Sequence, residues 1–309
     1  MRIVLFILLI LIAAWGTLAV AAEVVSRVHA PRGEKIDVGG HRLRLVCEGP
    51  RSANPVIWME AGAFSGAADF AALQQMLTAK GLRSCAYDRA GMGYSDAVPG
   101  VRDGDAIVSD LEKLIAKSGE QGPFILMGHS MAGLYVRQYA TRNPDKVAGL
   151  VLIDAVTPEM IALPGAETFI KGMTTLARVG AVAGSLGLKG PLYLMGDRIG
   201  LPPAGKAEKR RGFISGRQSR AALAEVLAWR VAGEQAGARP LDPKWPVAVI
   251  TAGPADRMGP WNVVRHAPGR ESRAGLIDNV EAASHTTVLG LTYGNHVIAG
   301  VDHILAALH

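Results

Sequence analysis

Several kinds of residue are scarce in this sequence, and each scarcity narrows what the protein can be. Only two cysteines, Cys47 and Cys85, occur in 309 residues, so the chain lacks the disulfide framework that staples small secreted domains. Aromatic residues make up 6% and charged residues 19% of the chain, and we find no internal repeat. This composition does not indicate a fibrous, repetitive or low-complexity protein.

The abundant residues are apolar ones. Hydrophobic residues make up 49% of the chain, which also contains 37 glycines. A chain of 309 residues can bury a sizeable core, either as one large α/β domain or as a domain that carries an insertion.

The longest apolar run lies at the amino terminus. Residues 3–22 (IVLFILLILIAAWGTLAVAA) contain no charge, and about 20 apolar residues are enough to cross a bilayer as a helix. The sequence Ala19-Val20-Ala21 also resembles a signal-peptide cleavage site. Residues 1–22 are therefore expected to be a transmembrane anchor or a signal peptide, and the protein to be membrane-anchored or exported. The flanking charges do not fix the orientation.

Positive charge is concentrated in one part of the chain. The formal net charge is +6, and residues 171–239 hold twelve Lys and Arg against four acidic residues, a local +8 (12 − 4). This segment can be a solvated basic face, or it can attract an anionic membrane surface or substrate. No nucleic-acid motif accompanies the charges, so nucleic acid is not an expected partner.

Strand-like and helix-like segments alternate along most of the chain. Strands are expected at 35–38, 42–47, 55–59, 83–87, 124–127, 147–153, 246–251 and 274–280, and helices at 68–79, 106–117, 131–142, 168–186, 221–232 and 295–308. Several strands are apolar throughout, which is typical of a mostly parallel sheet covered by helices on both faces. The alternation stops between residues 155 and 244. We therefore expect a core of residues 33–154 and 245–309, interrupted by a helical lid at 155–244.

A serine follows one of these apolar strands directly. In Gly128-His129-Ser130-Met131-Ala132 the serine ends a strand and precedes a helix, which is the context of a nucleophile elbow. Ala132 stands where the GxSxG pattern has its second glycine, a small change in size. Ser130 is the candidate nucleophile; the alternative is a small turn serine or a helix cap.

A serine nucleophile needs a base and an acid, which follow it in that fold in the order serine, acid, histidine. Asp256 comes after the strand VAVIT and is the preferred acid, with Asp154, after the preceding strand, as its rival. His285 lies between the last strand and the last helix and is the candidate base. The backbone amides of Met131 and Ala63 are the candidate oxyanion donors.

Taken together, these motifs resemble the α/β-hydrolase superfamily, specifically its lid-bearing serine hydrolases. The resemblance rests on CAYDRAGMGYSD, GHSMAG, GLVLIDAVTPE, the AGPAD turn and SH, spread over residues 36–308. It implies an eight-stranded, mostly parallel sheet and hydrolysis through an acyl-enzyme, with no cofactor and no metal. In that architecture the second and fourth strands are neighbours, so a Cys47–Cys85 bridge becomes an alternative to two buried thiols.

The leading hypothesis is a serine hydrolase of carboxylic esters, with lipophilic small molecules as candidate substrates. The same three residues could also serve amide, lactone or thioester hydrolysis, or perhydrolysis. A non-catalytic binding or receptor-like module on the same fold is the alternative from another class. The sequence does not indicate an oligomeric state.

Overall fold

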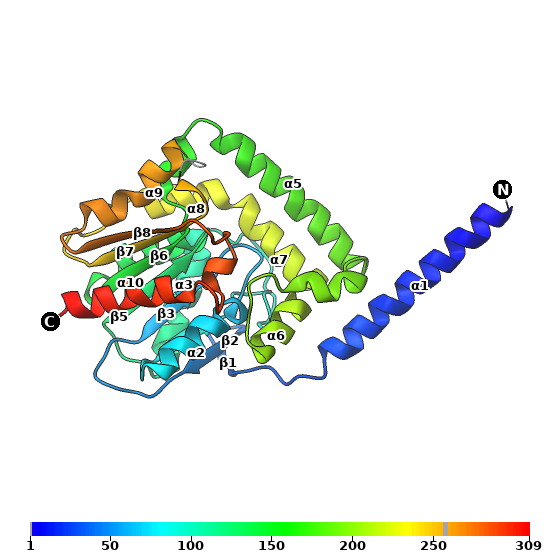
Figure 1. Ribbon diagram of the computed structural model, residues 1–309, viewed down its shortest axis with the longest axis horizontal. Coiled ribbons are helices and arrows are strands. Elements are labelled where there is room, and N and C mark those ends of the chain that lie inside the picture. Colours follow the sequence, from blue (N-terminus) through cyan, green and yellow to red (C-terminus); the bar gives the residue numbers. More distant parts are fainter. Residues whose placement is uncertain (1, 256–258) are drawn as a thin grey trace.

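The computed structural model describes residues 2–255 and 259–309 (Figure 1). Its first element is a long helix, α1 (Arg2–Ser26), whose amino-terminal part projects from the rest of the chain. An 18-residue window of α1 has a mean hydropathy of 2.9 and is entirely exposed. By length and composition α1 can cross a membrane.

One sheet of eight strands forms the centre of the molecule. The strands are β1 (Glu34–Asp37), β2 (Arg42–Glu48), β3 (Ile57–Glu60), β4 (Ser84–Tyr87), β5 (Phe124–His129), β6 (Val147–Ile153), β7 (Val247–Ala252) and β8 (Gly275–Val280). Their order is β1-β2-β4-β3-β5-β6-β7-β8. Strands β3 to β8 run parallel to one another, and β2 is antiparallel to both of its neighbours, β1 and β4. The predicted eight-stranded, mostly parallel sheet is confirmed.

Helices cover both faces of this sheet. They are α2 (Ala71–Ala79), α3 (Gly104–Ser118), α4 (Ala132–Arg142), α9 (Pro260–Glu271) and α10 (Gly294–Ala307). The side chains of α3 and α4 pack into one core with Trp58 of β3, and those of α2 and α10 pack into a second core with Ile57 and Met59. Successive strand residues point to opposite faces, so the apolar strands fill both cores at once.

An inserted group of helices separates β6 from β7, as the sequence predicts. It consists of α5 (Ala166–Ser185), α6 (Pro203–Ile214), α7 (Gly216–Leu227) and α8 (Trp229–Gly237). Short 3-10 turns complete the chain: η1 (Ala67–Phe70), η2 (Pro144–Lys146), η3 (Pro158–Ala162), η4 (Gly190–Gly196) and η6 (Thr287–Leu289). The helix expected at 221–232 is broken at Ala228, between α7 and α8.

The sequence pattern missed two helices. The first is α6, whose residues (PAGKAEKRRGFI) are mostly polar or small and show no apolar periodicity. The second is α9, which begins with proline and contains Pro268, a residue that normally argues against a helix interior. In both segments tertiary packing overrides weak local signals.

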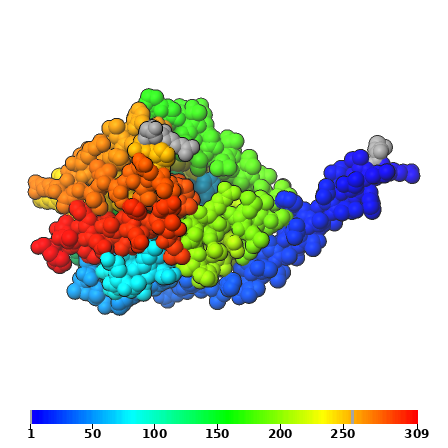
Figure 2. All heavy atoms as spheres, viewed as in Figure 1, coloured from blue at the N-terminus to red at the C-terminus, as the bar shows by residue number. Residues whose placement is uncertain are grey.

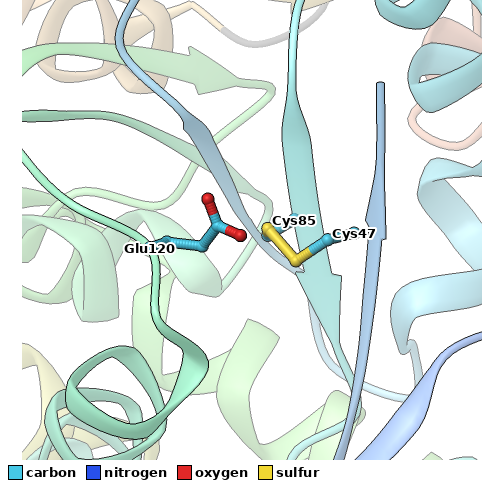
Figure 3. Close-up of side chains that lie close together, drawn as sticks. All are labelled: Cys47, Cys85 and Glu120. Carbon is cyan, nitrogen blue, oxygen red and sulfur yellow. A yellow bond between two sulfur atoms is a disulfide. The ribbon is translucent and has the colours of Figure 1, made fainter. Parts of the chain in front are cut away.

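The two cysteines are joined. Cys47 on β2 faces Cys85 on the antiparallel neighbour β4, and their sulfurs form a disulfide (Figure 3). Glu120 lies beside them, close enough for the three groups to suggest a metal site. With both sulfurs bonded neither offers a thiolate, and Oε1 of Glu120 accepts hydrogen bonds from Arg83 and Arg51. The cluster is therefore a structural bridge, of a kind that persists in oxidising compartments.

Removing this bridge is expected to lower the stability of the domain. The two cysteines are 38 residues apart, and closing a loop of that length restricts the unfolded chain by about 3–5 kcal/mol. We expect the double variant Cys47→Ala/Cys85→Ala to unfold at a lower urea concentration than the wild type in detergent. A reducing agent should shift the wild type toward the variant and leave the variant unchanged. Identical midpoints for the oxidised wild type and the variant would contradict this expectation.

Candidate active site

Ser130 lies at the sharp turn between β5 and α4. Its backbone φ is +56°, in the left-handed region that residues other than glycine rarely adopt. The turn leaves no room for side chains nearby: a Cβ on Gly128 would lie 2.7 Å from Cγ2 of Val136, and one on Gly133 would lie 2.4 Å from the carbonyl oxygen of Val156. The crowding explains the small residues around Ser130 in the sequence.

The chain brings Ser130 into contact with two other polar side chains. Oγ of Ser130 is 2.9 Å from Nε2 of His285, and Nδ1 of His285 is 2.5 Å from Oδ2 of Asp154. His285 comes from the loop between β8 and α10, and Asp154 directly follows β6. All three therefore lie at the carboxyl edge of the parallel sheet, where open α/β folds bind their ligands.

The carboxylate of Asp154 is held ionised. Burial works to raise its pKa, but the hydrogen bond to His285 and the charge of Arg265 outweigh burial and lower the pKa of Asp154 to about 2. Its Oδ1 accepts hydrogen bonds from the amide of Ala252, at 3.1 Å, and from the guanidinium of Arg265 on α9. Asp154 itself is strained, with φ +42°. A buried anion in this position fixes the proton of His285 on Nδ1.

The acid preferred in the sequence prediction is Asp256, which falls outside the described residues. The carboxylate that contacts His285 belongs to Asp154, the rival candidate. The sequence signals for Asp154 were its place directly after a buried strand and the small Ala155 that follows it.

The turn after β3 closes over Ser130 from the other side. A Cβ on Gly62 would lie 2.8 Å from Cβ of Ser130, so only glycine permits this approach. β3 and β5 are parallel neighbours with Glu60 opposite Gly128, which explains why the two turns meet. The candidate oxyanion residues belong to these two turns. Met131 follows Ser130 in the chain, and Ala63 follows Gly62 in the turn that approaches the serine.

A fully buried arginine holds that turn in place. Arg89 donates hydrogen bonds to the carbonyl oxygens of Ala61 and Gly62, and forms ion pairs with Glu60 at 2.6 Å and Glu225 at 2.7 Å. Glu60 ends β3, whereas Glu225 belongs to the inserted helix α7. Breaking a buried pair of this kind leaves an uncompensated charge. Arg89 therefore ties the inserted helices to the turn beside Ser130.

His129 supports the loop that carries His285. Its Nε2 donates to the backbone carbonyl oxygen of His285 at 2.8 Å, and the two rings lie 4.6 Å apart. Burial, together with the nearby His285, lowers the pKa of His129 to about 3. His129 is therefore neutral at physiological pH and contributes a fixed hydrogen bond.

An apolar pocket lies beside these residues, between the core and the inserted helices. Its lining contains no charged side chain and consists of Val156, Met160, Ile161, Ala166, Phe169, Ile170, Trp229 and Trp261. Val156 is also part of the elbow, because its amide donates to the carbonyl oxygen of Ser130 at 2.8 Å. Val156 therefore links the pocket to the elbow, although Ser130, His285 and Asp154 are not among the lining residues, and the apolar lining suits a small apolar group.

Comparisons with known proteins agree with this geometry. The family model described as "Serine aminopeptidase, S33" matches residues 52–186, the stretch that contains Gly62, Arg89, Ser130 and Asp154. The described fold aligns with a membrane phospholipase A at a TM-score of 0.61, with 19% identity and 98% of each chain covered. The chain has the α/β-hydrolase fold, and the family match covers its residues 52–186.

Further similar proteins carry different names. An epoxide hydrolase variant from Vigna radiata aligns with a TM-score of 0.63 and 16% identity, covering 87% of this chain and 98% of that chain. Among curated proteins, the uncharacterised YbdG of Bacillus subtilis is 27% identical over 153 residues, 48% of this chain. The match spans 47% of YbdG, so this chain aligns with about half the length of that relative. Such similarities establish the fold, and the site must supply the function.

Proposed function

We propose that the protein is a serine hydrolase that cleaves carboxylic esters through an acyl-enzyme. The observation that carries the proposal is the relay of two contacts, 2.9 Å from Ser130 to His285 and 2.5 Å from His285 to Asp154. Ser130 is the proposed nucleophile, His285 the base and Asp154 the acid, in place of Asp256. In the α/β-hydrolase superfamily that the sequence resembles, epoxide hydrolases and dehalogenases carry an aspartate nucleophile at the position of Ser130.

In the first half of the reaction, Oγ of Ser130 attacks the ester carbonyl carbon while its proton passes to Nε2 of His285. The backbone amides of Met131 and Ala63 are the proposed donors to the negative oxygen that forms. His285 then gives the proton to the departing alcohol, which leaves the acyl group on Ser130. Asp154 stabilises the imidazolium throughout and holds the ring in place.

In the second half, water takes the place of the alcohol. His285 removes a proton from the water, the hydroxide attacks the acyl-enzyme carbonyl, and the same amides bind the second oxyanion. Return of the proton to Oγ of Ser130 releases the carboxylic acid. The cycle needs no cofactor and no metal ion.

The substrate class follows from the surroundings of Ser130. The inserted segment 155–244 is the proposed lid, and a small pocket with a wholly apolar lining lies between it and the core. Amide, lactone and thioester substrates use the same relay, but this apolar lining, which includes Val156 of the elbow, favours lipophilic esters. Likeness to a membrane phospholipase A over 98% of this chain, which takes in nearly all of α1, supports a membrane-anchored hydrolase. The disulfide supports an extracytoplasmic location.

A fluorophosphonate probe tests the proposal, because it reacts covalently with activated serines. We expect the purified full-length chain to be labelled, the variant Ser130→Ala not to be labelled, and Ser284→Ala to be labelled like the wild type. Hydrolysis of p-nitrophenyl esters of increasing chain length then reports the acyl preference. A wild-type chain that resists the probe, or a Ser130→Ala variant that still reacts, would support the non-catalytic binding module.

A further inference from the structure

The outer face of α5 exposes a stripe of apolar side chains. It is formed by Leu176, Val179, Val182 and Leu186, which are between 59% and 67% exposed. Their spacing of three or four residues puts them on one side of a helix. The opposite side is buried through Ala177, Ala181 and Gly184. An exposed row of Leu and Val on the side of a helix that faces away from the protein indicates a surface that contacts a partner or a membrane.

The stripe continues into the segment after α5. Leu188, Leu194 and Met195 are 47% to 69% exposed. Part of this segment, η4, packs against α1: a Cβ on Gly190 would lie 2.5 Å from Cα of Ala19, and Tyr193 shares an apolar cluster with Ala22. The exposed stripe and the apolar amino-terminal helix are thus physically continuous.

The contact with η4 leaves most of α1 projecting beyond the inserted helices. Residues 2–18 are exposed without exception, and seventeen helical residues extend about 25 Å. In Figure 1, α5 runs crosswise to α1 on the side of the body from which α1 projects, and Figure 2 shows the amino-terminal part of α1 standing clear of the other atoms. A bilayer that receives the free part of α1 would therefore lie against the outer face of α5.

Charge on the same elements indicates the nature of that bilayer. At 100° per residue, Lys171 and Arg178 fall beside the apolar stripe of α5, and both are exposed. Arg198 and Arg220, in the segments next to it, are exposed as well. Apolar side chains bordered by exposed cations are the pattern of a surface that lies in the headgroup region of an anionic membrane.

We propose that the docking face, defined as Leu176, Val179, Val182, Leu186, Leu188, Leu194 and Met195, inserts into the headgroup region of the anionic bilayer that α1 enters. The apolar pocket begins at the amino-terminal end of the same helix, where Phe169 and Ile170 line it. A lipophilic ester can then pass from the bilayer to the pocket along α5 without crossing water. The passage of an ester from the bilayer to the pocket rests on the proposed esterase function, whereas the docking of α5 on the bilayer does not.

Depth-dependent quenching tests the docking. Both native cysteines are bonded to each other, so a single introduced cysteine takes an environment-sensitive fluorophore. The full-length chain carrying Val179→Cys is placed in vesicles of phosphatidylcholine with phosphatidylglycerol, some of them brominated. We expect blue-shifted emission and quenching by brominated lipid at position 179. The control Leu308→Cys, at the carboxyl terminus, should show neither, since Figure 1 has that end on the far side of the body from α1.

Two results would overturn the proposal. An unshifted, unquenched label at position 179 means that the face is in water. A blue shift without quenching by brominated lipid, together with cross-linking between chains, means that a second copy covers the face. In vesicles of phosphatidylcholine alone we expect weaker quenching, because the cations then lose their anionic partners.

An activity measurement separates this inference from the proposed function. The variant Val179→Glu/Val182→Glu changes only exposed positions, so it is expected to fold and to hydrolyse a soluble short-chain ester like the wild type. Its turnover of a lipid ester embedded in the vesicles should fall about tenfold or more, because two buried charges oppose insertion. Equal loss on both substrates, or no loss on either, contradicts the docking. Absence of any Ser130-dependent hydrolysis in the wild type contradicts the proposed function instead.

Discussion

The variants Ser130→Ala and His285→Ala are each expected to lower kcat for a p-nitrophenyl ester by about 10⁶, to the level left by substrate binding and the oxyanion donors. Without Oγ of Ser130 no acyl-enzyme forms. Without the imidazole, the serine hydroxyl keeps its proton at neutral pH and is a weak nucleophile. Because the two groups act as one unit, the double variant should be no slower than either single variant.

Two matched controls accompany this measurement. Ser284→Ala removes an exposed hydroxyl next to His285 that bonds only to Thr286 and Thr287 among the described residues. His296→Ala removes an exposed imidazole that pairs with Asp278 on the sheet edge. Both controls should keep near wild-type turnover. A Ser130→Ala variant with more than a few per cent of the activity would show that another group attacks the substrate.

Local pattern was sufficient to predict the sheet and the pair Ser130–His285. The central strands β5, β6 and β7 are short apolar runs bounded by turn residues. The close packing around Ser130 forces small neighbours that are visible in the sequence. The loop position of His285 follows from the order of the strands. Such features depend on neighbours along the chain, so they can be read without coordinates.

The identity of the acid could not be predicted in the same way, because the neighbouring strands β6 and β7 end at the same edge of the sheet and an aspartate follows each of them in the sequence. β6 and β7 are parallel neighbours with Ile153 opposite Ile250, so an aspartate after either strand can approach the loop of His285. The structural features that favour Asp154 are its backbone direction and a long-range contact. Asp154 adopts a positive φ and meets Arg265 on α9, a helix that the sequence pattern missed. The pairing of Arg89 with Glu225 could not be predicted for the same reason, since 136 residues separate them.

The variant Asp154→Asn is expected to lower kcat by about 10⁴. The present carboxylate accepts the proton on Nδ1 of His285 and so leaves Nε2 free to accept the proton of Ser130. An asparagine can present its amide NH₂ to Nδ1, which favours the opposite tautomer, and it provides no negative charge to stabilise the imidazolium. KM should change little, because Asp154 lies behind His285 and away from the apolar pocket.

Asp256→Asn is the matched control, and it decides between the two candidate acids. It should retain most of the activity if Asp154 is the acid, whereas equal losses in both variants would mean that Asp256 also takes part. Loss of the Asp154 charge leaves the buried guanidinium of Arg265 without this partner, which can destabilise the fold. The double variant Asp154→Asn/Arg265→Gln removes both charges, and a thermal melt verifies its folding. If that folded double variant hydrolyses ester at the wild-type rate, Asp154 has no part in the reaction.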